Sequence, residues 1–245
     1  MWKESWIITK NELMILWQSF LGTLLATILI GMMSASLLEQ MVPVLTDEEH
    51  LYSSIPLDIL FLFLTPCYST IFLSSPYLSF KTIKEDPFGK RMALYRAMPV
   101  STSILAGSRL LLMIVTFVAL SITYYISITF SLSDSFYQLV TMETYIPFIV
   151  FWLGYSLLIG SLNVYIEYGT NGKILYIFSF LYGLVMVTVI IIFWTIWNSG
   201  MVEAVLKMVN QTGWLSAVLM LILGIISFIC WGMLLKKRLN NRDYL

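Results

Sequence analysis

The feature that most constrains this chain is the separation of its charged residues from six long apolar stretches. No Lys, Arg, Asp or Glu occurs in residues 13–38, 59–80, 110–133, 144–166, 174–202 and 208–235. The shortest of these stretches has 22 residues, and a helix needs about 20 mainly apolar residues to cross a bilayer. Because a helix of a soluble protein normally keeps one polar face, the pattern predicts an integral membrane protein.

We therefore expect an all-α, polytopic membrane protein whose residues 1–245 form a single transmembrane domain. The six predicted spans are residues 16–38, 57–79, 103–130, 146–166, 174–197 and 214–235. An amphipathic helix at 1–15 would lie at the membrane interface, and residues 81–102 would form a loop between the second and third spans.

The distribution of basic residues predicts the orientation of these spans. The two ends of the chain and the loops after the second and fourth spans hold 13 of the 14 Lys and Arg residues, and only Lys207 falls on the other side. Since loops rich in Lys and Arg stay in the cytoplasm, both termini are expected to be cytoplasmic. We expect the protein to lie in the plasma membrane of a bacterial cell, where it contacts membrane lipids.

The chain lacks the residues that several classes of function require. The single histidine, His50, excludes an intramembrane metalloprotease, which needs at least two. No P-loop is present, so the chain is not expected to hydrolyse ATP itself. We expect no catalytic residue, no metal site, no cofactor on this chain and no nucleic-acid partner.

Ion-coupled transport is also disfavoured, because such transporters usually hold ionisable residues inside their spans. Here Asp58, Arg109, Glu143 and Glu167 lie only near the ends of the apolar stretches. Snorkelling or solvation at helix ends is expected to account for all of them.

The first 17 residues have an amphipathic pattern. At about 100° per residue, Trp2, Trp6, Leu13 and Trp17 lie on one face of a helix, whereas Glu4, Asn11 and Glu12 lie elsewhere. Tryptophan rings anchor at the depth of the lipid headgroups. The four apolar residues are therefore predicted to anchor the helix at the membrane interface.

Polar residues within the spans allow two interpretations. The second span carries Pro66 and Pro76 among hydroxyl side chains, and it is either a bendable helix that lines a path or an ordinary kinked span. On the fourth span, Asn163 shares a face with Gly160 and Ser156, for which helix packing is favoured over substrate binding. The candidate residues of a substrate path are Thr65, Ser69, Thr70 and Asn163.

The loop after the second span contains a predicted short helix at 86–98. Asp86 and Pro87 are a typical helix start, with an N-cap acceptor before a proline, and Pro99 disfavours a helical Met98. One face carries Phe88, Met92 and Tyr95, and the charged residues are Lys90, Arg91 and Arg96. Such a helix either docks into a groove on another protein or lies on anionic lipid.

The stretch at residues 84–109 resembles a known family. Its string Arg96-Ala97-Met98-Pro99-Val100-Ser101, followed by Ile104, Gly107 and Arg109, is similar to the segment after the coupling helix in permease subunits of type-2 class ABC exporters. The amphipathic N-terminal helix, the six spans and the basic helical loop resemble the same family over the whole chain.

The resemblance implies a mechanism and partners. The chain would pair with a second permease, either itself or a paralogue, and with two copies of a cytoplasmic ABC ATPase subunit that binds ATP and Mg. Residues 86–98 would be the coupling helix that enters a cleft on the ATPase, and 2–14 the connecting helix. The outer loop at 198–213 often folds back into the membrane in this family.

The leading hypothesis is therefore a permease subunit of an ATP-driven exporter, without an ATPase site of its own. Uncharged spans rich in Met and aromatic residues suit an amphipathic or hydrophobic substrate, such as a peptide, lipid or drug. The alternative is a non-transporting membrane immunity or sensor protein that binds peptides or lipids. An ion-coupled carrier is the least favoured class.

Overall fold

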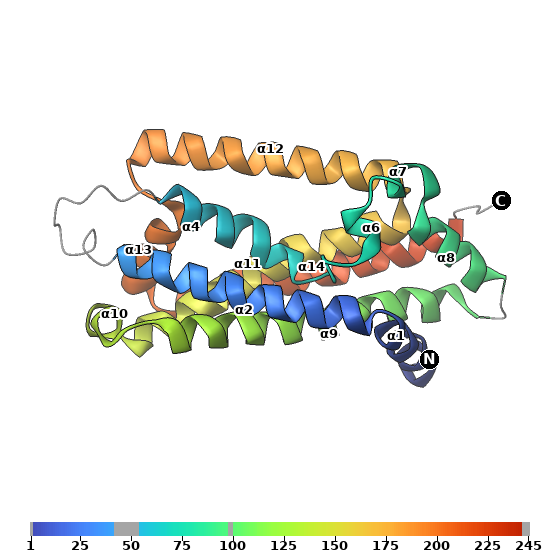
Figure 1. The fold of residues 1–245 in the computed structure, drawn as a ribbon, viewed down its shortest axis with the longest axis horizontal. Helices are drawn as coiled ribbons and strands as arrows, with labels where there is room; N and C mark the ends of the chain where they lie inside the picture. The colour runs from blue at the N-terminus through green and yellow to red at the C-terminus, as the bar shows by residue number, and fades with distance from the viewer. Residues whose placement is uncertain (1, 42–53, 98–99, 242–245) are drawn as a thin grey trace.

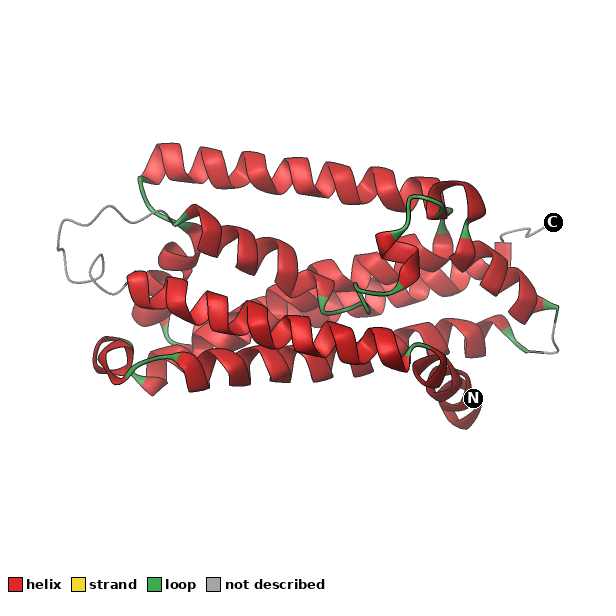
Figure 2. Ribbon diagram, in the orientation of Figure 1, coloured by secondary structure: helices red, strands yellow, loops and turns green. Residues whose placement is uncertain are grey.

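A computed structural model describes residues 2–41, 54–97 and 100–241. These residues form helices and turns and contain no strand, which confirms the all-α prediction for this part of the chain (Figure 2). The long helices lie side by side along one axis (Figure 1). Both ends of the described chain lie at the same end of this bundle, which we call the terminal end (Figure 1).

Five helices of the described chain are long and apolar enough to cross a membrane. They are α2 (Trp17–Gln40), α9 (Thr102–Ser131), α11 (Met142–Gly169), α12 (Gly172–Trp197) and α14 (Trp214–Asn241). Each contains nearly all of one predicted span. The chain therefore has the character of a multi-pass membrane protein.

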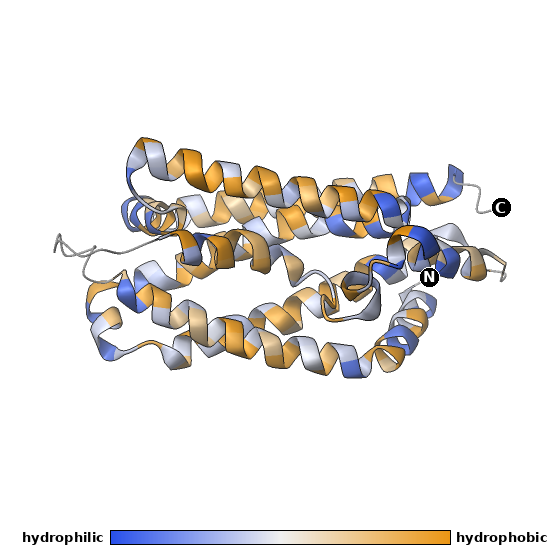
Figure 3. Ribbon diagram, turned by 45° about the horizontal axis from the view of Figure 1, so that its top comes forward, coloured by the Kyte–Doolittle hydropathy of each residue, from blue (hydrophilic) through white to orange (hydrophobic). Residues whose placement is uncertain are grey.

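The surface of the bundle agrees with this character. Hydrophobic residues cover its long sides, and hydrophilic residues gather at its two ends (Figure 3). Helix α12 is exposed over most of its length, and its exposed side chains include Phe180, Leu184 and Trp194. A helix that is apolar all round and uncovered by protein is suited to contact with lipid tails.

The predicted second span, 57–79, is not one continuous helix. Helices α4 (Ile55–Ile59) and α5 (Thr65–Cys67) are joined by a π-helical segment, Leu60–Leu64. No helix forms at 68–74, and α6 (Ser75–Leu78) follows. The continuous part, Ile55–Cys67, rises only about 20 Å at ~1.5 Å per residue, which is less than the ~30 Å hydrocarbon core.

The sequence explains where this segment breaks. Pro76 has no N–H to continue a helix through the preceding turn, and the hydroxyls of Ser69 and Thr70 donate back to the carbonyl oxygens of Pro66 and Cys67, at 2.8 and 2.9 Å. Non-helical backbone is tolerated at membrane depth only inside protein or beside water. Tyr68 and Ser69 are accordingly buried.

The π-helical segment is held by two tyrosines. The carbonyl oxygen of Leu62 accepts hydrogen bonds from Tyr155 of α11 at 3.0 Å and from Tyr182 of α12 at 2.8 Å. A π-helical turn disturbs the usual backbone ladder, so these hydroxyls satisfy a carbonyl that lies away from water. They also fasten the exposed α12 to the broken span.

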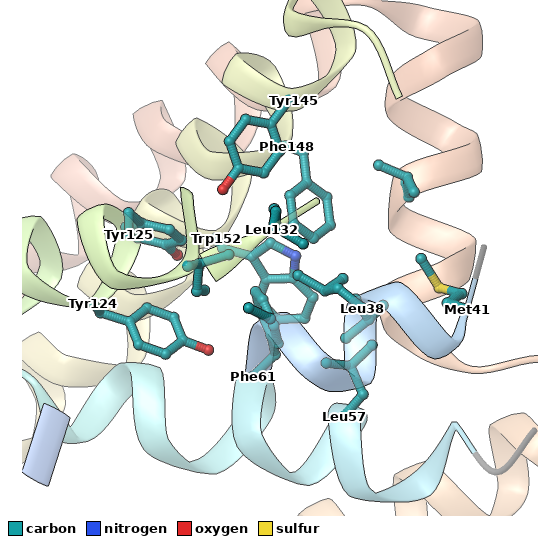
Figure 4. Packing of buried hydrophobic residues seen from close by; sticks show 14 of the residues in the cluster. Leu38, Met41, Leu57, Phe61, Tyr124, Tyr125, Leu132, Tyr145, Phe148 and Trp152 are labelled. Carbon is teal, nitrogen blue, oxygen red and sulfur yellow. The ribbon is translucent and has the colours of Figure 1, made fainter. Parts of the chain in front are cut away.

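An aromatic core fills the bundle toward the end opposite the terminal end. Phe61 of the π-helical segment packs on Trp152 of α11, with ring centroids 4.9 Å apart, and Tyr124 and Phe148 surround it (Figure 4). Aromatic rings each bury a large apolar area and prefer such tilted contacts. This core links the broken span to α9 and α11.

At the same end, α10 (Asp134–Leu139) and α13 (Met201–Thr212) connect the long helices. Residues 198–213, for which a re-entrant segment was considered, contain α13, whose Val202, Leu206 and Val209 are buried. Asp58 accepts hydrogen bonds from the backbone N–H groups of Met201 and Val202, both at 2.9 Å. The carboxylate thereby caps the first turn of α13.

We expect Asp58→Ala to lower the free energy of unfolding by about 2 kcal/mol, because two buried N–H donors would lose a charged acceptor. Asp58 is only 1% exposed, so water cannot replace it. Thermal unfolding of the purified protein in lipid nanodiscs measures the loss. Asp134→Ala, at an exposed position on α10, is the control, and an equal effect of the two substitutions would contradict the capping role.

Candidate functional site

The first helix, α1 (Trp2–Ile15), turns its polar side toward the protein. Ser5 donates to the carbonyl oxygen of Ile104 at 3.1 Å, and Thr9 donates to that of Ser108 at 3.0 Å. Both acceptors belong to α9. Hydroxyls that bond across a helix pair are a usual means of association in membranes, so α1 is fixed against the start of α9.

The predicted anchoring residues lie away from this contact. Trp2, Trp6 and Trp17 are exposed, and Leu13 is half-buried. The helix is turned out of line with α2 at the terminal end of the bundle (Figure 1). Trp2 and Trp6 of α1 are therefore free to contact a membrane interface. Trp17 is the first residue of α2, so the prediction that it shares a helix face with them is wrong.

The centre of the site is an ion pair that joins α1 to α9. Both terminal nitrogens of Arg109 donate to the Glu12 carboxylate. Arg109 is only 1% exposed and Glu12 2%. Such a two-pronged Arg–carboxylate contact fixes geometry as well as charge. The expectation that Arg109 snorkels to solvent is therefore wrong, because α1 brings a carboxylate to it.

Three further side chains surround this pair. Tyr95 donates to Glu12 at 3.1 Å, and a terminal nitrogen of Arg91 lies 3.7 Å from the same carboxylate. The guanidinium of Arg109 lies over the ring of Tyr168, 4.5 Å from its centroid. Partial burial and the nearby Glu12 raise the pKa of Tyr95, so its hydroxyl stays protonated and remains a donor.

A second buried carboxylate lies beside the pair. Glu167, near the end of α11, is 6% exposed and accepts a hydrogen bond from the hydroxyl of Tyr77 on α6. Asp58 is buried as well. Solvation at helix ends thus fails as an explanation for Asp58, Arg109 and Glu167, whereas Glu143 is exposed as expected.

The predicted helix at 86–98 is present as α8 (Pro87–Arg96). The side chain of Asp86 accepts hydrogen bonds from the backbone N–H groups of Gly89 at 3.2 Å and of Gly172, at the start of α12, at 3.1 Å. This cap therefore also ties α8 to the loop between α11 and α12. Residues 98–99, where the helix was predicted to end, lie outside the described residues.

The face of α8 that was predicted to enter a partner points into this chain instead. Phe88 and Met92 are buried, and the ring of Phe88 packs on Tyr168 and Tyr77, with centroid distances of 5.3 and 5.8 Å. These side chains anchor α8 and are not available to a partner. The exposed side of α8 carries Lys90 and Leu94, and the side chain of Arg96 lies outside the described part.

The predicted path residues mainly join helices. Asn163 donates to the hydroxyl of Ser69 at 3.3 Å, and Thr116 of α9 donates to the carbonyl oxygen of Ser69 at 3.2 Å. Thr65 donates to Phe61 of its own helix at 2.6 Å. This pattern favours packing over substrate binding for Thr65 and Asn163, although Ser69 and Thr70 also line a cavity.

That cavity has a volume of about 40 Å³ and lies between the broken span, α8, α9 and α11. Its polar walls are formed by side chains from all of them: Ser69, Thr70, Ser74, Arg91, Arg109, Thr116 and Glu167. A water molecule needs roughly 10–15 Å³ and two to four polar partners. The cavity is therefore suited to two or three waters.

Sequence reasoning missed Glu12, Arg109 and Glu167 as partners in one site. A signal was available for α1, because Ser5, Thr9 and Glu12 form a polar stripe at helical spacing. No pattern indicated that Arg109 faces that stripe, because the contact depends on how α1 packs.

Comparison with protein-family models, with curated proteins and with solved structures found no match.

Proposed function

We propose that the chain is the permease subunit of an ATP-driven ABC exporter and works with a separate ATPase subunit. The observation that carries this proposal is the attachment of α8. Phe88, Met92 and Tyr95 connect this helix to α1, α9 and α11. A displacement imposed on α8 from outside would reach these helices directly, because the buried contacts leave it little independent movement.

The exposed surface near α8 is suited to a protein partner. Lys90 and Leu94 lie on α8. Ile83 lies on the neighbouring α7 (Thr82–Glu85), and Phe80 lies just before it. Phe80 is 79% exposed. Apolar side chains bordered by lysines are a usual composition for an interface with a polar rim.

The terminal end would be the cytoplasmic side. It carries nearly all the basic residues of the described chain, as the positive-inside rule requires. Helix α1 would lie at the inner interface, with its tryptophans among the headgroups. The exposed apolar faces of α2 and α12 would contact lipid or a second permease subunit, and an amphipathic or hydrophobic substrate would pass between the two permeases.

The double substitution Lys90→Glu with Leu94→Asp tests the coupling surface. Both positions are exposed, so the chain should fold normally. We expect the variant, when co-expressed with an ABC ATPase subunit that binds the wild type, to form at least about a tenfold weaker complex, because a rim charge is reversed and an apolar contact is lost. Binding is measured by pull-down of the purified subunits in detergent, and transport-linked ATP hydrolysis should fall in parallel.

Lys236→Glu on the exposed end of α14 is the matched control and should leave the complex intact. Equal binding by all three proteins would contradict the docking of α8, whereas no binding by any of them would favour a non-transporting membrane protein. Phe88→Ala is unsuitable for this test, because Phe88 belongs to the core of the chain itself.

A further inference from the structure

We propose that Glu167 is a proton-binding site, whose carboxyl group takes up and releases a proton through the polar cavity beside it. The proposal goes beyond the permease function and does not depend on an ATPase partner. It rests on the burial of Glu167, the lack of a cation paired with it among the described residues, and the room for water at its side.

Burial opposes the charged form of this group. Glu167 is 6% exposed, and a carboxylate loses much of its favourable hydration when it leaves water. In the described part of the chain, no basic side chain comes within ion-pair distance of it. The nearest candidate, Arg109, is already engaged by both oxygens of Glu12.

Other contacts support the charged form. Tyr77 donates a hydrogen bond to one carboxylate oxygen, which stabilises the anion. The titratable and charged groups that face Glu167 from the surrounding elements are Glu12 on α1, Tyr77 on α6, Arg91 on α8, Arg109 on α9 and Tyr168 on α11. With Glu12 ionised, the two arginines leave one positive charge, which an ionised Glu167 would balance.

Burial and the second carboxylate thus favour the protonated form, whereas the arginines and Tyr77 favour the ionised one. Burial is the largest of these influences. The carboxyl group therefore exchanges its proton at a less acidic pH than an exposed carboxyl, which does so near pH ~4.

The cavity provides the route for the proton. Its wall includes Glu167, Thr70 and Ser74, and it extends to Arg91, whose side chain is 29% exposed. Arg109, which also lines the cavity, has a buried Nε atom without a hydrogen-bond partner. A water in a polar cavity of this size can satisfy such a donor, and waters there would connect Glu167 toward the surface near Arg91.

The exchange would act on the broken part of the second span. Tyr77 belongs to α6, directly after the non-helical residues 68–74. When Glu167 is ionised, its bond to Tyr77 is charge-assisted and therefore stronger. Protonation would weaken the link between α6 and α11 at this point. Proton binding would thereby alter how firmly the broken span is held.

Infrared difference spectroscopy of the purified full chain in lipid nanodiscs tests the proposal. Lowering the pH from about 8 to 5 should produce the carbonyl stretching band of a protonated carboxyl group, because exposed carboxyls titrate mainly below this range. The band should be absent in Glu167→Gln and unchanged in Glu143→Gln, which alters an exposed carboxylate on the same helix.

A second variant keeps the test decisive if Glu167→Gln fails to fold. Tyr77→Phe removes only the hydroxyl that stabilises the anion, so the midpoint of the band should rise by up to about one pH unit. The proposal is overturned if the wild-type spectrum shows no pH-dependent carboxyl band in this range, if Glu167→Gln retains the band, or if Tyr77→Phe lowers the midpoint.

Discussion

Replacing Arg109 by methionine is expected to lower the free energy of unfolding by about 3–5 kcal/mol. The substitution preserves most of the side-chain volume but removes the two-pronged partner of the buried Glu12 carboxylate, which keeps only the more distant Arg91 at 3.7 Å. Removing one partner of a buried ion pair has a cost of this size, because the remaining charge stays buried without its closest counter-charge. Glu12 is 2% exposed, so hydration cannot replace the arginine unless α1 detaches from α9.

Unfolding in mixed micelles, followed by the fluorescence of the tryptophans, provides the measurement. The double substitution Glu12→Gln with Arg109→Met should recover a large part of the loss, because two neutral groups replace an unpaired charge. Lys10→Met, at an exposed position on α1, should stay within about 0.5 kcal/mol of the wild type. If Arg109→Met is no worse than Lys10→Met, the ion pair does not hold α1 in place.

The spans could be predicted from sequence because their cause is local. An uninterrupted apolar run of sufficient length usually forms a membrane helix, and the five long helices follow from that rule, whereas the run at 59–80 is broken. The helix α8 was equally accessible, since Asp86 and Pro87 are signals that act within one turn. The orientation of α8 could not be predicted from the sequence, because the burial of Phe88 depends on Tyr168 from α11.

The same distinction explains why the candidate site was missed. Arg109 and Glu167 lie at the margins of apolar stretches, where solvation is the usual outcome. Whether such a residue is buried depends on the segment packed over it, here α1 for Arg109 and α6 for Glu167. The break of the second span was partly visible in Pro66 and Pro76, but composition alone could not separate a kink from seven non-helical residues at 68–74.

The contact between α11 and α14 should also be sensitive to a single substitution. Gly154 of α11 faces the backbone of α14, and a Cβ atom there would lie 2.6 Å from the backbone nitrogen of Leu221. On the other side, a Cβ at Gly224 would lie 2.5 Å from the carbonyl oxygen of Gly154. The obstacles are backbone atoms, so no side-chain rotation can relieve them.

We therefore expect Gly154→Ala to lower the unfolding free energy by about 1–3 kcal/mol and Gly154→Val by more. An alanine in place of a helical glycine normally gains up to about 1 kcal/mol, so the sign itself is diagnostic. Gly183→Ala on α12 is the control, because its added Cβ would meet Phe63 at an ordinary 3.6 Å, and it should be neutral or stabilising. The hydrophobic effect does not hold helices together within lipid, where close packing takes its place. A stabilising Gly154→Ala would mean that α11 and α14 do not approach this closely.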